Sequence, residues 1–331
     1  MKKAIIIGVS GQDGAYLSQL LLEKGYKVIG VSRQLNNSPF TNLRYLNVLS
    51  EIEMFELPEN NAEAVEQILL THKPDEVYNL GAQSSVGQSF VDPIYTVNYN
   101  ILSVLHWLEG IKKLQLNTRF YQASSSEMFG NVRSTDLPLS ESLLFHPASP
   151  YGVSKAAAHW LAVNYREANG IFSACGILFN HESALRGPNF VVKKIINAAI
   201  QIKLGLKTDP ISVGNTAIQR DWGYAPKYVE AMWKILQHSV AEDFLICSGN
   251  VMSLTDLVTI VMRKLDLDIE KHLTIDQNLF RPVDLEVIYG DNTKAKKILN
   301  WDYNISNEEL IDLLIADEYT FIEWEASQTK K

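Results

Sequence analysis

A glycine-rich turn between a strand-like and a helix-like segment constrains the fold of this chain more than any other feature. Residues 2–9, KKAIIIGV, form a short β-branched run, and residues 14–26, GAYLSQLLLEKGY, repeat apolar side chains at helical spacing. Gly8, Gly11 and Gly14 lie at this junction, where missing side chains let backbone N–H groups approach a pyrophosphate. The turn therefore predicts dinucleotide binding, although glycines also serve plain tight turns.

Strand-like and helix-like segments alternate along the first half of the chain. Further strands are predicted at 27–33, 75–82 and 119–127, and further helices at 100–114 and 154–170. This alternation predicts an α/β fold with a doubly wound parallel sheet of the Rossmann type, covered by helices on both faces.

The second half of the chain has a different pattern. Amphipathic helices are predicted at 191–205, 227–239, 254–265 and 307–325. We expect residues 1–175 to form the dinucleotide-binding domain, with the chain crossing back to it later. Residues 176–331 should form a smaller, mixed and mainly helical substrate domain, and their last stretch, ASQTKK at 326–331, should fray.

Composition disfavours several classes of protein. The 331 residues are 46% hydrophobic, enough for a large core, and the net charge of −8 argues against a nucleic-acid partner. Cys175 and Cys247 are the only cysteines, too few for a disulfide framework or a cysteine-based metal site. Glycines and an aspartate interrupt the apolar N-terminal run before it reaches the length of a signal peptide. We expect a cytoplasmic protein without a membrane span or a bound metal.

Arg33 indicates which dinucleotide the turn would bind. The second strand ends in GVSR, without the acidic residue that holds the ribose hydroxyls in NAD enzymes, and Arg33 is placed to meet a 2′-phosphate. NADP is therefore expected rather than NAD. The alternative is that Arg33 is a solvated loop charge.

Tyr151 precedes Lys155 by four residues and follows a proline that suits a helix start. A tyrosine hydroxyl has an ordinary pKa of about 10, so it acts as a base near neutral pH only where positive charge stabilises the phenolate. Positions i and i+4 share a helix face, so Lys155 can supply that charge, and an oxidised nicotinamide would add more. The pair predicts a catalytic tyrosine, with a surface pair on an amphipathic helix as the alternative.

A second candidate base lies at the end of the strand predicted at 119–127, in the run Ser124, Ser125, Ser126, Glu127. Ligands bind at the carboxyl ends of parallel strands, and a carboxylate there costs free energy by desolvation unless it is used or paired. We therefore interpret Glu127 as a base. Helix capping or an arginine partner is the structural alternative.

Several longer motifs resemble the extended short-chain dehydrogenase/reductase family, and within it the GDP-mannose 4,6-dehydratases. The motifs are GVSGQDGAYL, PDEVYNLGAQSSV, YQASSSEMFG, SPYGVSKAAAHWLAVNYREANGIF, GILFNHES, RDWGYAPKYVEAMWKILQ and RPVDLEVIYGDNTKAKKILNW. They span nearly the whole chain, and the glycine spacing GxxGxxG fits the same family. The resemblance implies hydride transfer from sugar C4 to NADP⁺, elimination of water across C5 and C6, and return of the hydride at C6.

The resemblance also implies a role for each candidate residue. Ser125 would bond the sugar 4-hydroxyl and Tyr151 would remove its proton. Lys155 would hold the nicotinamide ribose, and Glu127 would handle the C5 proton. Cofactor contacts are implied for Gly8, Gly11, Gln12, Asp13, Gly14, Arg33, Glu56, Leu57, Leu80, Gly81, Ala82, Gln83, Ser84, Tyr95, Lys155, His181 and Arg186. Contacts to a GDP-sugar are implied for Ser85, Asn180, Lys194, Arg220 and Arg281.

Two of these assignments keep a structural alternative. Arg220 is followed by Asp221, so the two side chains could form an ion pair instead of a ligand site. His181 could be a satisfied core histidine.

Some positions depart from the family pattern. Ser125 and Glu56 stand where threonine and aspartate are usual, and both changes keep the chemistry. The motif SALRG retains only Arg186 of the usual pair of arginines, and Gln34 follows Arg33 where a second arginine is common. We therefore expect weaker cofactor binding than is usual in the family.

Other departures concern assembly and substrate. The segment 36–57 is shorter than the family norm, so the expected homo-oligomer could be a dimer or a tetramer. Ser85 and Asp284 replace histidine and glutamate near the sugar, which leaves GDP-mannose and a close relative such as a GDP-manno-heptose both open.

Three functions follow from these observations. A GDP-sugar 4,6-dehydratase is favoured over a reductase or epimerase of the same family, because a reductase needs no C5 base such as Glu127. A catalytically silent NADP-sensing protein should lack Tyr151 or Lys155, and both are present.

Overall fold

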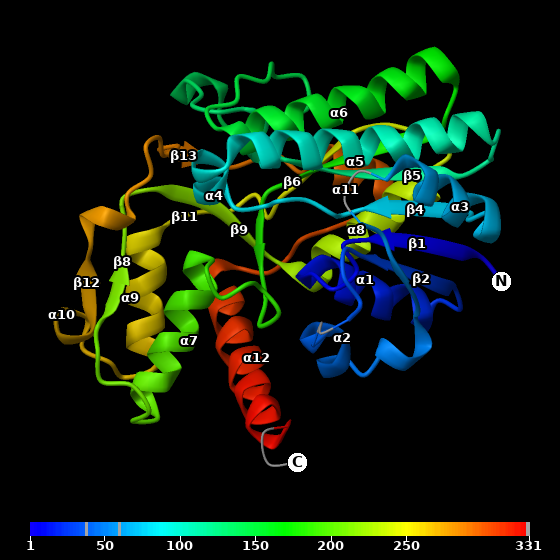
Figure 1. The fold of residues 1–331 in the computed structure, drawn as a ribbon. Helices are drawn as coiled ribbons and strands as arrows, with labels where there is room; N and C mark the ends of the chain where they lie inside the picture. Colours follow the sequence, from blue (N-terminus) through cyan, green and yellow to red (C-terminus); the bar gives the residue numbers. More distant parts are fainter. Residues whose placement is uncertain (37–38, 59–60, 329–331) are drawn as a thin grey trace.

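A seven-stranded parallel sheet forms the centre of the larger part of the molecule (Figure 1). This computed structural model describes residues 1–36, 39–58 and 61–328. From one edge to the other, the strands are β10 (Phe244–Ile246), β6 (Ser173–Leu178), β5 (Arg119–Ser125), β4 (Glu76–Asn79), β1 (Lys3–Ile7), β2 (Lys27–Ser32) and β3 (Glu53–Glu56). Every neighbouring pair is parallel, which confirms the predicted doubly wound fold.

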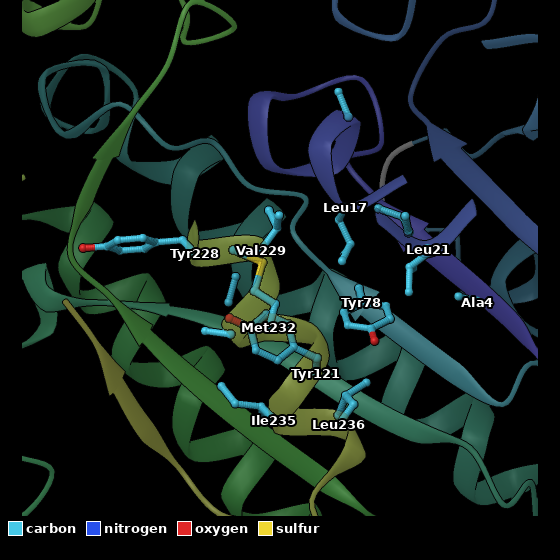
Figure 2. Packing of buried hydrophobic residues seen from close by; sticks show 14 of the residues in the cluster. Ala4, Leu17, Leu21, Tyr78, Tyr121, Tyr228, Val229, Met232, Ile235 and Leu236 are labelled. Carbon is cyan, nitrogen blue, oxygen red and sulfur yellow. The ribbon is translucent and has the colours of Figure 1, made fainter. Parts of the chain in front are cut away.

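Both faces of this sheet are buried under helices. The helices that flank it are α1 (Gln12–Glu23), α3 (Ala62–His72), α5 (Pro93–Lys113), α6 (Pro150–Asn169) and α8 (Ala225–Gln237). Alternate residues of β1 point to opposite faces, so Ala4 and Ile6 pack with α1 and α8, whereas Ile5 and Ile7 pack with α3 and α5. Figure 2 shows the first of these layers, where Leu17 of α1 and Met232 of α8 lie in the same cluster of buried side chains. Burial on both faces explains why the strand reads as a continuous apolar run.

The chain leaves the large sheet after β6 and later returns to it. The second part contains β7 (Asn180–Glu182), α7 (Val191–Lys203), β8 (Ile211–Val213), β9 (Gln219–Tyr224), β11 (Val251–Ser253), α9 (Leu254–Lys264), α10 (Ile269–His272), β12 (Leu273–Ile275), β13 (Val287–Ile288) and α12 (Asn307–Gln328). Strand β9 pairs with β7, β11 and β13, and β8 pairs with β12. Between these elements in sequence, strand β10 joins the large sheet and helix α8 packs against it. The division of the chain into two domains at residue 175 stays a prediction.

Short elements complete the fold. They are α2 (Thr41–Tyr45), α4 (Val86–Val91), α11 (Thr293–Leu299) and the 3₁₀ turns Leu49–Glu51, Ser126–Met128, Ser134–Asp136 and Gln277–Leu279. None of the described helices has both the length and the apolar character needed to cross a bilayer.

Several element boundaries differ from the predicted ones. Strands β3, β6 and β10 of the large sheet were not predicted. Helix α6 begins at Pro150, which confirms the helix start predicted there and extends the predicted helix 154–170 by four residues. The predicted fraying of 326–331 is wrong for Ala326–Gln328, which continue α12, while 329–331 lie outside the described residues. Because Ser149 accepts a hydrogen bond from the Gly152 N–H at 3.0 Å, capping places the helix start at the proline.

A buried ion pair fastens α12 to α7. Lys193 Nζ donates to the Glu318 carboxylate and to the Ala184 carbonyl, and Asn197 Nδ2 donates to the other Glu318 oxygen at 2.6 Å. Both charged side chains are buried, so each depends on the other for compensation of its lost hydration.

We expect Glu318→Ala to lower the free energy of unfolding by about 3 to 5 kcal/mol, because it leaves the Lys193 ammonium buried without a counter-charge. Urea unfolding at pH 7 measures this loss. Glu308→Ala, which breaks the surface pairs with Arg263 and Lys264, is the matched control and should cost less than about 1 kcal/mol. Equal losses for the two variants would show that the buried pair has no special role.

Candidate active site

The glycine turn brings the N-terminus of α1 close to the carboxyl ends of β1 and β4. Gly8 has a φ of +81°, and a Cβ there would lie 2.9 Å from the Gly81 nitrogen. A Cβ on Gly14 would lie 2.3 Å from the Gly8 carbonyl oxygen. Glycine is therefore required at both positions, and the turn leaves a cradle next to the helix N-terminus.

A cavity of about 790 Å³ opens over this turn. Of the predicted cofactor residues it is lined by Gly8, Gly11, Gln12, Asp13, Gly14, Arg33, Leu57, Leu80, Gly81, Ala82, Ser84 and Arg186. Glu56, Gln83 and Tyr95 line neither this cavity nor the one described below. Tyr99, Ser103 and His106, which were not predicted from the sequence, line it from one face of α5. Only their spacing along the helix could have pointed to them.

The predicted residues outside the cavity support its wall. Arg33 donates a hydrogen bond to the Tyr95 hydroxyl and lies 5.4 Å from the centre of the Tyr99 ring. The Glu56 carboxylate accepts from the Leu35 N–H at 2.8 Å. Arg33 is thus placed at the rim by aromatic side chains of α5. Residues 37 and 38 of the shortened segment lie outside the described residues.

Asp13 and His181 join the glycine turn to β7. His181 Nε2 lies 2.9 Å from an Asp13 oxygen, and its Nδ1 lies 2.7 Å from the Phe179 carbonyl. Burial alone would raise the pKa of Asp13, but the charge and hydrogen bond of His181 lower it to about 2. The Gln12 amide donates to the His181 carbonyl at 3.1 Å and accepts from Ser183. His181 is therefore a hydrogen-bonded, buried histidine that also borders the second cavity.

A second cavity, also of about 790 Å³, adjoins the first. The two share the lining residues Asp13, Leu80, Ala82, Ser84 and Arg186. The second is lined by all four predicted catalytic residues and by all five predicted sugar-nucleotide residues, namely Ser125, Glu127, Tyr151, Lys155, Ser85, Asn180, Lys194, Arg220 and Arg281. The structure therefore brings together side chains that the sequence separates by almost 200 positions.

Ser125 and Tyr151 meet where β5 ends and α6 begins. The Tyr151 hydroxyl is hydrogen-bonded to Ser125, whose oxygen also accepts from the Glu127 N–H at 3.3 Å. Lys155 Nζ lies 5.8 Å from the centre of the Tyr151 ring and donates to the Ala123 carbonyl at 2.9 Å. The predicted i, i+4 pairing on one helix face is thus present.

Lys155 does not by itself make Tyr151 a base. Burial raises the pKa of Tyr151 to about 12, although the Ser125 hydrogen bond and the Arg186 charge lower it. Burial also lowers the pKa of Lys155 to about 8, against the opposing effect of Asp13. Desolvation therefore dominates the pKa of Tyr151 in this structure, and the predicted stabilisation of its phenolate by Lys155 together with an oxidised nicotinamide stays a prediction.

Glu127 lies among charged side chains in the second cavity. Burial raises its pKa, Arg220 and Arg281 oppose that rise, and Asp284 adds to it. Arg281 pairs with Asp284 at 3.7 Å. A buried carboxylate with a raised pKa, held near two guanidinium groups, is a candidate acid–base group.

Arg220 is available to the cavity rather than paired with its neighbour. The Asp221 carboxylate accepts from the Ser248 and Gly249 N–H groups at 2.7 and 2.9 Å, on the opposite side of the strand. Nη2 of Arg220 is buried without a hydrogen-bond partner among the described residues. The ion pair with Asp221, considered as an alternative from the sequence, is absent from the described part of the chain.

The arrangement supports acid–base chemistry on an anionic ligand. Arg220, Lys194 and Arg281 supply positive charge for phosphate oxygens, and two bases of different type lie beyond them in the same cavity. Among the described residues, no cluster of three or more histidine, cysteine, aspartate or glutamate side chains could hold a metal ion.

Comparison with known proteins identifies close relatives. A model of the family described as GDP-mannose 4,6 dehydratase matches residues 5–314. GDP-mannose 4,6 dehydratase 1 of Arabidopsis thaliana is 40% identical over 329 residues, which cover 96% of this chain and 90% of that protein. GDP-mannose 4,6 dehydratase of Homo sapiens is 38% identical over 340 residues, covering 95% of this chain and 91% of that protein.

Solved structures with lower identity share the fold. A UDP-glucose 4-epimerase from Thermotoga maritima with UDP-glucose superposes with a TM-score of 0.86 at 24% identity, covering 97% of this chain and 99% of that chain. A dTDP-glucose 4,6-dehydratase from Bacillus anthracis in complex with NAD gives a TM-score of 0.84 at 17% identity, covering 98% of each chain. At these identities the likeness establishes the fold alone.

We expect Gly14→Ala to lower the free energy of unfolding by about 3 kcal/mol or more, because its Cβ would overlap the Gly8 carbonyl and the turn has no room to give way. Urea unfolding measures the loss. Gly25→Ala is the control: its φ is +78° but nothing lies within 4 Å, so only about 1 to 2 kcal/mol of backbone strain is expected. A smaller loss at Gly14 than at Gly25 would contradict the tight cradle.

Proposed function

The chain belongs to the GDP-mannose 4,6-dehydratase family, and on that premise we propose that it removes water from a GDP-linked sugar to give the 4-keto-6-deoxy product. The observation that carries the proposal is the placement of Glu127 with Ser125 and Tyr151 in one cavity that Lys194, Arg220 and Arg281 also line. The substrate is GDP-mannose or a close GDP-sugar such as a GDP-manno-heptose.

The first cavity fits a nicotinamide dinucleotide. Its glycine cradle admits a pyrophosphate where any Cβ would collide, and the N-terminus of α1 favours the negative charge. Such a cofactor, when bound, supplies the group that accepts hydrogen from sugar C4 and returns it at C6, so none is consumed. Arg33 at the rim favours the 2′-phosphate of NADP, and Lys155 is placed to hold the nicotinamide ribose.

Tyr151 and Ser125 act on the sugar 4-hydroxyl. Ser125 orients this hydroxyl through the hydrogen bond that it also makes to Tyr151, and Tyr151 removes the proton as C4 is oxidised to a ketone. The positive charge of an oxidised nicotinamide offsets the burial that raises the pKa of Tyr151. Oxidation must come first, because only the 4-keto group makes the C5 proton acidic enough for a carboxylate base.

Glu127 then carries out the elimination. It takes the proton from C5 and donates it to the departing C6 oxygen, which leaves as water. Once water has left, Glu127 is a carboxylate again and must gain a proton before it can return one to C5. The proton that Tyr151 took from the 4-hydroxyl, passed on through the solvent or the intervening hydroxyl, replaces it, so both residues end the turnover as they began.

The other functions lack a use for part of this site. A reductase of the same fold has no need of a base for the C5 proton, and a silent sensing protein has no need of the Tyr151–Ser125 hydrogen bond. Arg220, Lys194 and Arg281 together are proposed to neutralise the diphosphate of the sugar nucleotide. Ser85 and Asn180 are proposed to contact the sugar nucleotide from the wall of the same cavity.

We expect Glu127→Gln to reduce formation of the 4-keto product at least about 100-fold, because the amide keeps the shape of the carboxylate but cannot accept a proton. Product absorbance in alkali measures turnover, and calorimetry measures binding of the GDP-sugar, which should persist. Glu127→Asp, which keeps a carboxylate on a shorter arm, should retain more activity than the glutamine variant. Turnover of Glu127→Gln above a tenth of the wild-type rate would rule out its role as the base.

Arg33→Ala should weaken NADP binding about 10- to 100-fold and leave NAD binding nearly unchanged, because a charge-assisted contact to the 2′-phosphate is worth about 1.5 to 3 kcal/mol. Fluorescence titration with each dinucleotide measures this difference. Arg44→Ala removes an exposed arginine outside both cavities and should alter neither affinity. Equal weakening of NADP and NAD by Arg33→Ala would show that the arginine is structural.

A further inference from the structure

Helix α6 contacts the end of β5 through side chains spaced four residues apart. Tyr151 bonds to the Ser125 hydroxyl and Lys155 donates to the Ala123 carbonyl. His159 is the next residue in this series, one further turn along the same helix face. The first two residues belong to the proposed catalytic set, whereas His159 has no role in the mechanism given above.

His159 is hydrogen-bonded to the residue that precedes Ser125. Its Nδ1 lies 3.0 Å from Ser124 Oγ, and both side chains are almost fully buried, with 4% and 2% exposure. Phe145 and Trp160 pack edge-on against the imidazole and fix its plane. Burial lowers the pKa of His159, which favours the neutral ring, and one nitrogen of the neutral ring can accept a hydrogen bond from the Ser124 hydroxyl.

The far side of the imidazole faces a fixed carboxylate. His159 Nε2 lies 4.0 Å from Asp243, next to the edge strand β10. Two hydrogen bonds of 2.8 Å from Arg166 and one of 3.1 Å from the Cys175 N–H hold Asp243 in place. The imidazole therefore lies between an anchored charge at the sheet edge and the strand that carries Ser125.

We propose that His159 is a positioning residue that sets the end of β5, through Ser124, so that the Ser125 hydroxyl meets Tyr151. Successive side chains of a strand point to opposite faces, so a bond that holds Ser124 toward α6 also aims Ser125 into the cavity. A satisfied hydrogen bond between buried side chains rigidifies its surroundings and specifies one geometry. The geometry concerned here is that of the Ser125 and Tyr151 hydroxyls. The inference rests on the proposed function, because it assumes that Tyr151 is the base.

Three variants test the hydrogen bond. His159→Leu removes the hydrogen bond and fills the site with an apolar side chain of similar volume. His159→Asn places an amide group where Nδ1 lies, and Ser124→Ala removes the hydroxyl that bonds to the imidazole. We expect His159→Leu to lower kcat about 10- to 100-fold with KM for the GDP-sugar changed less than about twofold, because misplaced reacting groups cost rate rather than binding. His159→Asn should restore kcat to within about threefold of wild type. Combining Ser124→Ala with His159→Leu should cost no more than either alone.

The pH profile of kcat separates positioning from simple loss of stability. The Ser125 hydrogen bond lowers the pKa of Tyr151, so weakening it should raise that pKa and move the rise of kcat to higher pH in His159→Leu but not in His159→Asn. The charged groups that face Tyr151 are Glu127, Asp13, Arg186 and Lys155, and none of them is altered.

His72→Leu is the matched control. This histidine is also buried, but it lies on α3 beside Phe55, near the amino ends of the strands and away from the cavities. It should leave kcat and the pH profile unchanged, even if the free energy of unfolding falls as much as in His159→Leu.

Wild-type turnover in the same assay distinguishes failure of this inference from failure of the proposed function. Crystal structures of the variants give a reading that needs no substrate: the Tyr151–Ser125 hydrogen bond should be lost in His159→Leu and kept in His159→Asn. The proposal is overturned if the bond survives in His159→Leu, if that variant keeps the wild-type kcat and pH profile, or if the asparagine variant loses as much activity as the leucine variant.

Discussion

The site depends on desolvation of ionisable side chains at the carboxyl edge of the parallel sheet. Burial is the largest influence on the pKa of Asp13, Glu127, Tyr151 and Lys155. It makes each group sensitive to one neighbouring charge, since water no longer screens the interaction. His181 holds Asp13 ionised, Arg220 and Arg281 limit the rise in the pKa of Glu127, and burial favours the protonated form of Tyr151. In the function proposed above, the positive charge that offsets this burial comes with the ligand, which would link the chemistry to ligand binding.

The sequence predicts those parts of the molecule that short-range patterns specify. Short runs of consecutive residues specify the glycine turn, the alternation of strands and helices and the Tyr151–Lys155 spacing. The structure contains the predicted parallel sheet and has Tyr151 and Lys155 on one helix. Strands β3 and β10 escaped prediction because four and three residues carry too little periodicity. The raised pKa of Tyr151 could not be predicted from the sequence, because desolvation depends on elements that are distant in sequence.

Tertiary packing also decided the alternatives that the sequence left open. Asp221 bonds the backbone at 248 and 249, which frees Arg220 for the cavity. The link from Asp243 past His159 to Ser124 joins residues 119 positions apart, and no spacing rule reveals it. Positioning contacts of this kind are set by side chains behind the catalytic strand, where motif comparison gives no signal.

In the proposed function, one molecule of GDP-sugar is oxidised, dehydrated and reduced without leaving the site. GDP-mannose or a GDP-manno-heptose carrying deuterium at C4, incubated with the purified protein without added cofactor and followed by mass spectrometry, tests this sequence of steps. We expect a product lighter by one water that retains the deuterium, now at C6. Loss of the deuterium to solvent, or turnover that requires a stoichiometric reductant, would exclude the internal hydride transfer.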